Sequence, residues 1–121
     1  MYKTPIFKGS CTAIVTPFGE NGIDYDKMAE LIDFQYDNGT AALVVCGTTG
    51  ENATMSAYEH EELIEFACRY NDNRMKIIAG IGSNDTQKAL KFANFTHNIK
   101  KNTCIAALYA VKYHRFRTDT L

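Results

Sequence analysis

Short, continuous runs of apolar residues alternate along this chain with longer stretches in which apolar residues recur every three to four positions. The compact runs cover residues 11–16 (CTAIVT), 41–46 (AALVVC), 75–81 (MKIIAGI) and 104–111 (CIAALYAV). Runs of this length, bounded by turn residues, are typical of strands that are buried on both faces. The sequence therefore predicts strands at these places.

Helical spacing fills the stretches between the runs. A first helix is predicted from Asp24 to Asn38, with Asp24 as its N-cap and Gly39 placed to end it. A second helix begins at the S-x-x-E capping box that Ser56 and Glu59 form. Each helix separates two predicted strands.

A third helix is predicted over residues 86–97, with Asn84, Asp85 or Thr86 as its cap. In all three helices one apolar stripe is expected to face the core. The side chains in these stripes are Met28, Leu31, Ile32 and Tyr36, then Leu63, Ile64, Ala67 and Tyr70, and finally Leu90, Phe92 and Ala93.

The resulting order β-α-β-α-β-α-β predicts one α/β domain over residues 1–121, with parallel strands covered by helices. A doubly wound sheet and a (β/α)8 barrel begin in the same way, so periodicity alone does not separate them. In both, the loops that leave the carboxyl ends of the strands build the site. These loops are residues 16–18 (TPF), 47–51 (GTTGE) and 82–86 (GSNDT).

Composition narrows the range of functions. The 121 residues carry a net charge of -1, and 45% of them are hydrophobic, as in an ordinary globular chain. No basic face for nucleic acid is expected, and the one basic cluster, residues 112–117 (KYHRFR), is interpreted as a polar end. No apolar run approaches the ~18 residues of a membrane span, and the N-terminus lacks a signal-peptide pattern. We expect a cytoplasmic protein with no membrane partner.

Cysteines and histidines give no catalytic or metal-binding pattern. Cysteines stand far apart in the sequence, without a CxxC pair, so they are predicted to be small buried side chains in a reducing compartment. Histidines lack a neighbouring nucleophile, so surface or capping positions are expected. The acidic run 59–62 (EHEE) is explained by the dipole of the helix it opens, and no metal site is predicted. The residues concerned are Cys11, Cys46, Cys68 and Cys104, and His60, His97 and His114.

The loop GTTGE offers the clearest chemistry. Gly47 and Gly50 permit positive φ and close approach of a ligand, while Thr48 and Thr49 supply hydroxyls and N–H donors for a carboxylate or phosphate. Glu51 either holds the turn or is a solvated charge. The plainer alternative is a connector that uses glycine only for its geometry.

Two phosphate-binding motifs are excluded at these glycines. A P-loop requires lysine after its last glycine, where this chain has Glu51. A dinucleotide fingerprint requires a third glycine, but residues 80–85 (GIGSND) end in aspartate.

The three loops together resemble the dihydrodipicolinate synthases, a family of pyruvate-dependent aldolases. The resemblance is carried by AIVTPF (13–18), GTTGE (47–51) and AGIGSND (79–85), in this order, and it covers residues 6 to 99. It implies a (β/α)8 barrel and a Schiff-base condensation of pyruvate with L-aspartate 4-semialdehyde, without metal or organic cofactor. It also implies a homotetramer for the full-length family.

Residue roles follow from the same resemblance. Thr48 would relay protons and Thr49 would bind the pyruvate carboxylate, with Gly47 and Gly50 shaping the site. Threonine at 48 favours the synthases over N-acetylneuraminate lyases, which carry serine there. A sugar-acid lyase and a non-catalytic, pyruvate-binding module remain as alternatives.

Five positions correspond to the family's lysine-feedback pocket, namely Asn52, Ala53, His60, Gly82 and Asn84. Ala57 and Lys88 stand where lysine-inhibited members carry histidine and glutamate. An ammonium group at Lys88 would repel lysine, so weak or absent inhibition is expected.

The resemblance accounts for part of a barrel only. A full barrel needs roughly 250 residues, so the chain is expected to form the first three to four β/α units. Residues 100–121 lack the family's TPYYN-like segment and look like an altered reading frame, and neither Tyr109 nor Tyr113 can be assigned its role. The Schiff-base lysine is expected beyond Leu121, so this chain alone should be inactive and prone to aggregation.

Overall fold

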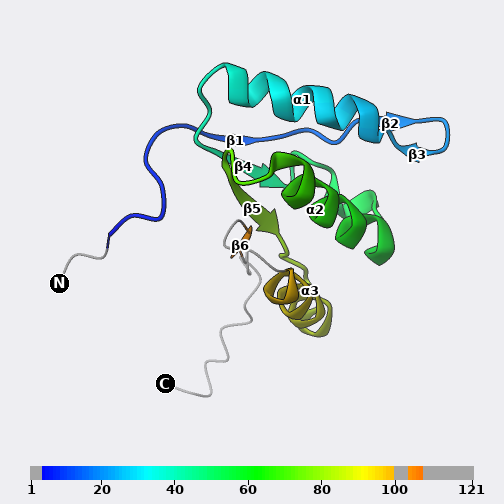
Figure 1. Cartoon of the computed structure of the whole chain (residues 1–121). Helices are drawn as coiled ribbons and strands as arrows, with labels where there is room; N and C mark the ends of the chain where they lie inside the picture. Colours follow the sequence, from blue (N-terminus) through cyan, green and yellow to red (C-terminus); the bar gives the residue numbers. More distant parts are fainter. Residues whose placement is uncertain (1–3, 100–103, 108–121) are drawn as a thin grey trace.

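The computed structural model describes residues 4–99 and 104–107, the latter by backbone alone. Within this part, a parallel sheet contains β1 (Cys11–Ala13), β4 (Ala42–Val45), β5 (Lys76–Gly80) and β6 (Cys104–Ala107) in that order. Successive strands are connected by α1 (Tyr25–Asp37), α2 (Ala57–Asn71) and α3 (Thr86–Asn98), which follow one another along one side of the sheet (Figure 1). The predicted alternation of strands and helices, and the parallel pairing, are confirmed.

One face of the sheet and all three helices share a single core. Leu43 pairs with Ile77 in the register of β4 and β5, and both point toward the helices. The same cluster takes in Met28 of α1, Leu63 of α2 and Phe92 of α3. A doubly wound sheet carries helices on both faces. The described elements instead form successive β/α units whose helices all lie on one side of the sheet.

The prediction that the first strand is buried on both faces is wrong. Thr12 faces α1, where its hydroxyl donates to Gln35 Oε1 at 3.0 Å, but Cys11 and Ala13 on the other face are exposed. Val15 beyond them is 52% exposed. Within the described residues β1 pairs with β4 alone, and the helices cover only its Thr12 side. Cys11 is thus an exception to the predicted burial of the cysteines.

The predicted helix caps are confirmed. The Asp24 carboxylate accepts from Lys27 N at 2.9 Å, and Gly39 takes φ +83° directly after the C-cap of α1. Ser56 and Glu59 form a complete capping box at the start of α2. Of the three candidates for α3, Asp85 is the cap and accepts from Gln87 N at 3.0 Å.

Three residues predicted to face the core lie at the surface instead. In α3 the buried stripe is Ala89, Phe92 and Thr96, so Leu90 projects outward and is 53% exposed. Tyr36 and Tyr70 are 44% and 36% exposed, and the Arg74 guanidinium lies 5.0 and 5.5 Å from their ring centroids. These rings hold a cation at the surface, a contact that an apolar stripe does not reveal.

Two small elements were not predicted. Strands β2 (Phe18–Gly19) and β3 (Gly22–Ile23) form an antiparallel ribbon that begins at the last residue of the predicted loop 16–18. Asn21 followed by Gly22, which has φ +108°, is a common hairpin signal and could have revealed the ribbon. A 3-10 turn, η1 (Asn52–Thr54), leads from the glycine loop to α2. In the described part no helix combines the length and apolarity needed to span a bilayer.

Candidate functional site

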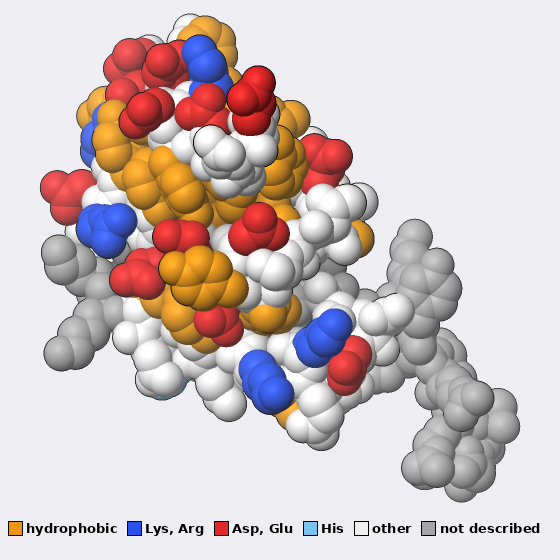
Figure 2. Space-filling model, turned by 90° about the vertical axis from the view of Figure 1, so that its right-hand side faces the viewer, with side chains coloured by type: hydrophobic (Ala, Val, Ile, Leu, Met, Phe, Trp, Pro, Cys, Tyr) orange, Lys and Arg blue, Asp and Glu red, His pale blue; other side chains and the backbone are white. Residues whose placement is uncertain are grey.

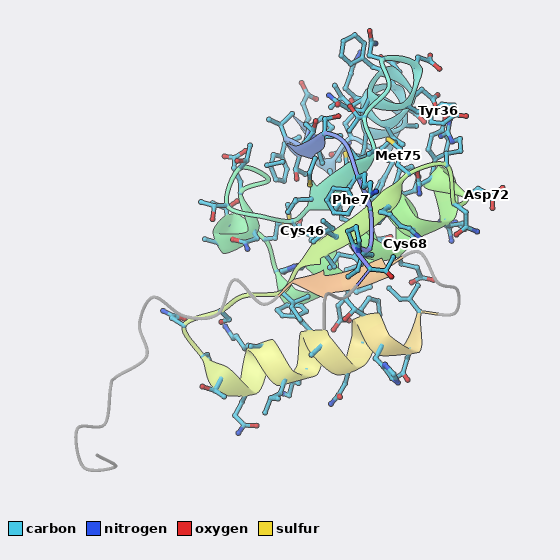
Figure 3. The ribbon with its side chains drawn as sticks, turned by 90° about the vertical axis from the view of Figure 1, so that its left-hand side faces the viewer. Phe7, Tyr36, Cys46, Cys68, Asp72 and Met75 are labelled. Carbon is cyan, nitrogen blue, oxygen red and sulfur yellow. The ribbon has the colours of Figure 1, made fainter. Side chains whose placement is uncertain are left out.

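The glycine loop follows Cys46, the residue directly after β4, at the carboxyl edge of the sheet. Figure 3 shows Cys46 at this edge, with Asp72 and Met75 at the opposite edge. Thr16, in the segment that follows β1, reaches the same place, since its buried hydroxyl donates to the Gly50 carbonyl at 2.8 Å. The loop is therefore held by a segment that follows another strand.

The backbone of the loop is a series of tight turns. Gly50 N donates to the Gly47 carbonyl at 3.1 Å, and Glu51 N donates to the Thr48 carbonyl at 3.0 Å. The left-handed conformations lie at Cys46, with φ 58°, and at Glu51, with φ 59°. Such conformations cost a non-glycine residue about 1–3 kcal/mol and persist only where the surroundings enforce them.

Gly47 and Gly50 do not take positive φ, which corrects the prediction; each instead packs closely against its neighbours. A Cβ on Gly47 would lie 3.1 Å from Val44 Cγ1, and one on Gly50 would lie 3.2 Å from Thr16 Oγ1 and 3.3 Å from Cys46 Cα. Both glycines are buried beneath the turn. The loop is thus packed down onto the ends of the strands.

Thr48 and Thr49 are exposed, in contrast to the glycines that flank them. Within the described residues their hydroxyls make no hydrogen bond, and their main-chain N–H groups find no acceptor. Hydroxyls and N–H groups in this state can donate to an anion placed above the strand ends. Glu51 is also exposed, and its carbonyl accepts from both the N–H and the hydroxyl of Thr54. Glu51 therefore supports the turn through its backbone.

Gly80, at the carboxyl end of β5, lies directly against the start of the loop. A Cβ there would fall 2.6 Å from the Cys46 carbonyl carbon, 2.8 Å from Gly47 N and closer still to the Cys46 carbonyl oxygen. No side chain fits such a gap without a shift of backbone. Gly80 belongs to the AGIGSND motif and to the excluded dinucleotide motif, but its packing role was not predicted. A glycine that ends a strand beside a glycine-rich loop is the signal that could have revealed it.

His60 is buried, so its predicted surface position is wrong. It is 4% exposed, and its Nε2 lies 2.6 Å from the Gly80 carbonyl. Because a carbonyl only accepts, Nε2 carries the proton. Burial lowers the pKa of His60, opposed by the hydrogen bond to Gly80 and by the charge of Glu61. The imidazole is therefore a neutral donor, fixed in the first turn of α2.

Cys46 is held from two further directions. Asn52 Nδ2 donates to the Cys46 carbonyl at 3.0 Å, and the Cys46 thiol donates to the His60 carbonyl at 3.8 Å. Burial raises the pKa of this thiol to about 12. A thiol that stays protonated in this way is packing material rather than a nucleophile.

The positions compared with a lysine-feedback pocket fall into two groups. Asn52 and His60 contact the base of the loop, as described above. Ala53 is exposed in η1, Gly82 is partly buried and Asn84 is exposed between β5 and α3. Ala57 and Lys88, the two positions that differ from lysine-inhibited members, are both exposed in the first turns of their helices. Tyr109, Tyr113, Cys104, His114 and the basic cluster 112–117 lie outside the residues whose side chains are described.

A depression lies on the helical side, away from the loop. It is lined by Tyr58, Glu61, Glu62, Glu65, Phe66, Arg69 and Phe95. Figure 2 views this side of the molecule, where acidic side chains border a band of hydrophobic ones. It is open to solvent and brings together the carboxylates of Glu61, Glu62 and Glu65 beside Arg69. In residues 4–99 no three His, Cys, Asp or Glu side chains form a metal-binding group.

Comparison with known sequences identifies relatives of the whole described region. A sequence model of the "Dihydrodipicolinate synthetase family" matches residues 6–112. The chain is 44% identical over 114 residues to the 4-hydroxy-tetrahydrodipicolinate synthase of Aquifex aeolicus, a match that covers 94% of this chain and 38% of that protein. It is 52% identical over 86 residues to the enzyme of the same name from Lachnoclostridium phytofermentans, covering 70% of this chain and 29% of that one.

Solved structures give the same relationship. The dihydrodipicolinate synthase of Aquifex aeolicus superposes with a TM-score of 0.77 at 42% identity, covering 83% of this chain and 34% of that one. The chloride-inhibited enzyme of Acinetobacter baumannii, complexed with pyruvate, gives 0.75 at 33% identity, covering 83% and 35%. The chain therefore spans well under half the length of the relatives it matches. With nearly all of its length aligned to these proteins, the chain belongs to the dihydrodipicolinate synthetase family.

Proposed function

We propose that the chain carries the pyruvate-binding loop of a 4-hydroxy-tetrahydrodipicolinate synthase. In this proposal Thr49 binds the pyruvate carboxylate through its hydroxyl and N–H, and Thr48 relays protons. The observation that carries it is the contrast between the exposed Thr48 and Thr49 and the buried backbone of Gly47 and Gly50. Donors on a fixed backbone suit a small anion, because little reorganisation is needed when it binds.

The relatives support pyruvate as that anion. The Acinetobacter baumannii structure is described as a complex with pyruvate, and the matched relatives are named as synthases. Threonine rather than serine at position 48 agrees with the synthases among the pyruvate-dependent aldolases. We therefore favour the synthase over a sugar-acid lyase.

The proposed reaction is a condensation with L-aspartate 4-semialdehyde. A lysine amine adds to the pyruvate ketone and water leaves, which gives a protonated imine; loss of a methyl proton gives an enamine whose carbon bonds to the aldehyde. The imine itself is the electron sink, so the scheme needs no metal or organic cofactor. Thr48 would pass protons between these intermediates and the aldehyde oxygen.

The remaining parts of this scheme come from the longer family chain. We propose that the four described strands correspond to the first three to four β/α units of a (β/α)8 barrel, and that the Schiff-base lysine follows residue 121 in the family. The full-length enzyme would be a homotetramer in the cytoplasm. Lys88 would repel an ammonium ligand near Asn52, Ala53, His60, Gly82 and Asn84, so lysine should inhibit weakly or not at all.

Pyruvate titration of the 15N-labelled chain tests the proposal. We expect saturable shifts of the Thr48 and Thr49 amide signals at millimolar pyruvate. Thr49→Val keeps the β-branched shape and removes the hydroxyl, so pyruvate affinity should fall by about tenfold. Thr40→Val is the matched control, since the Thr40 hydroxyl bonds to Gln35 Oε1 at 2.7 Å, before β4 rather than after it.

Two results would contradict the proposal. One is a Thr49→Val chain that binds pyruvate as tightly as the original, and the other is an equal loss of affinity in Thr40→Val. Reduction with borohydride in the presence of pyruvate adds an independent check. We expect no covalent adduct by mass spectrometry, because the chain should lack the nucleophilic lysine.

A further inference from the structure

We infer that His60 is a positioning residue for the glycine loop, acting through the Gly80 carbonyl on the Cys46–Gly47 peptide that carries Thr48 and Thr49. The inference rests on the proposed function only in naming pyruvate as the ligand that feels the effect. The mechanical link between His60 and the loop stands on the contacts themselves. His60 then has a role that needs no bound effector.

Two contacts fix the His60 ring, one with Phe92 and one with Gly80. Its ring centroid lies 4.1 Å from that of Phe92, with 33° between the planes, so α3 packs against it. Nε2 meets the Gly80 carbonyl at 2.6 Å, a buried hydrogen bond that joins the start of α2 to the end of β5. Removal of this donor from the buried carbonyl would lower the stability of the fold by about 1–3 kcal/mol. The end of β5 is thus tied to the α2 helix.

Gly80 passes this restraint to the loop by contact. Its Cα sits so close to Cys46 and Gly47 that not even a methyl group fits between them. Backbone in contact at this distance moves together, because protein interiors are close-packed. A shift of the Gly80 carbonyl therefore displaces the peptide between Cys46 and Gly47.

The contacts that start at His60 also end at His60. From His60 the path runs through its side chain to Gly80, through backbone contact to Cys46, and back through the Cys46 thiol to the His60 carbonyl at 3.8 Å. Cys46 is the residue held in the left-handed conformation, at φ 58°, from which the loop departs. Together these contacts fix Cys46, the strained residue that sets the direction of Thr48 and Thr49.

The required chemistry at position 60 is a neutral side-chain N–H of sufficient reach. Glutamine offers such a donor, while leucine offers comparable volume without one. Asn71 provides a matched control on the same helix. It is fully buried and bonds to Met75 N and the Met75 carbonyl at 3.1 and 2.7 Å, at the opposite edge of the sheet. Asn71→Ala should lower stability without moving the loop.

The test combines NMR spectra with pyruvate titration of the full chain and three variants, His60→Leu, His60→Gln and Asn71→Ala. In the original chain, long-range 15N spectra should show His60 protonated at Nε2 and not at Nδ1. His60→Leu should shift the amide signals of residues 47–50 and weaken pyruvate binding about tenfold, and His60→Gln should restore both to within about threefold. Asn71→Ala should leave both unchanged.

Each alternative outcome is decisive. An Nδ1-protonated ring, unchanged loop amides in His60→Leu, or equal effects of His60→Leu and Asn71→Ala would overturn the inference. If His60→Leu does not fold, the tautomer of the original chain and the loop amides of His60→Gln decide it. If the original chain binds no pyruvate, the proposed ligand fails, while the loop amides still decide whether His60 positions the loop.

Discussion

The exposed threonines of the loop depend on residues that touch no ligand. Thr16, Asn52 and Gly80 each contact the loop from a different segment, and together they fix its backbone at Gly50 and Cys46. None of these three is distinguished by residue type alone. A threonine hydroxyl, an asparagine amide and a glycine acquire their roles because the carboxyl ends of parallel strands lie together.

His60 should make the stability of the chain depend on pH. Burial lowers its pKa in the folded state, while the unfolded chain keeps a value of about 6.5. Well above pH 6.5 both states hold the neutral ring. As the pH falls below 6.5 the unfolded state takes up the proton first, so the free energy of unfolding decreases until the folded pKa is reached. The loss is about 1.4 kcal/mol for each pKa unit of lowering.

Urea unfolding between pH 7.5 and 5.5 measures this effect. The original chain should lose stability over the range, and His60→Gln should remove most of the loss. His97→Gln is the control, since His97 is exposed. Equal pH profiles for the original chain and His60→Gln would show that the His60 pKa is not lowered.

Among the elements, α2 matters most for the loop, because its first turn contains His60. The capping box satisfies two backbone donors there, with Ser56 N donating to Glu59 Oε2 at 2.8 Å and Glu59 N donating to Ser56 Oγ at 3.1 Å. Ser56→Ala should therefore lower the free energy of unfolding by about 1 kcal/mol. It should also speed amide hydrogen exchange in the first turn of α2, as measured by NMR.

Ser10→Ala serves as the control, because Ser10 is exposed outside any helix. Its effect should stay within about 0.5 kcal/mol. A Ser56→Ala chain as stable as Ser10→Ala would mean that the box contributes nothing and that tertiary packing alone fixes the start of α2.

The elements themselves could be predicted because their signals are local. Asp24 and Ser56 mark helix starts, and the apolar runs mark strands, without reference to the rest of the chain. The burial of His60 and the exposure of Leu90 could not be predicted in this way. Both depend on how α2 and α3 are rotated against the sheet, which is settled by packing among distant residues. The threonines of the loop could be predicted as candidates because the loop motif is local. The contacts of Thr16 and Gly80 with the loop could not, because they join segments that are distant in the sequence.

For the whole molecule, the main consequence of the one-sided arrangement is an open sheet face at β1. Cys11, Ala13 and Val15 lie exposed on the side away from the helices, beside a strand edge that has no partner among the described residues. Exposed apolar faces and free strand edges promote association. The helix-covered side of the sheet therefore holds the hydrophobic core, while the other side leaves apolar residues of the β1 region exposed to solvent.

Association through this face can be tested with two variants matched in exposure and charge. Val15 is 52% exposed on the open face and Leu90 is 53% exposed on the outer surface of α3. The chain should gain apparent mass with concentration in light scattering. Val15→Lys should suppress the gain, because a charged side chain beside the end of an edge strand opposes association there, while Leu90→Lys, with the same added charge, should not. A chain that stays monomeric at every concentration, or equal suppression by both variants, would exclude the β1 face as the site of association.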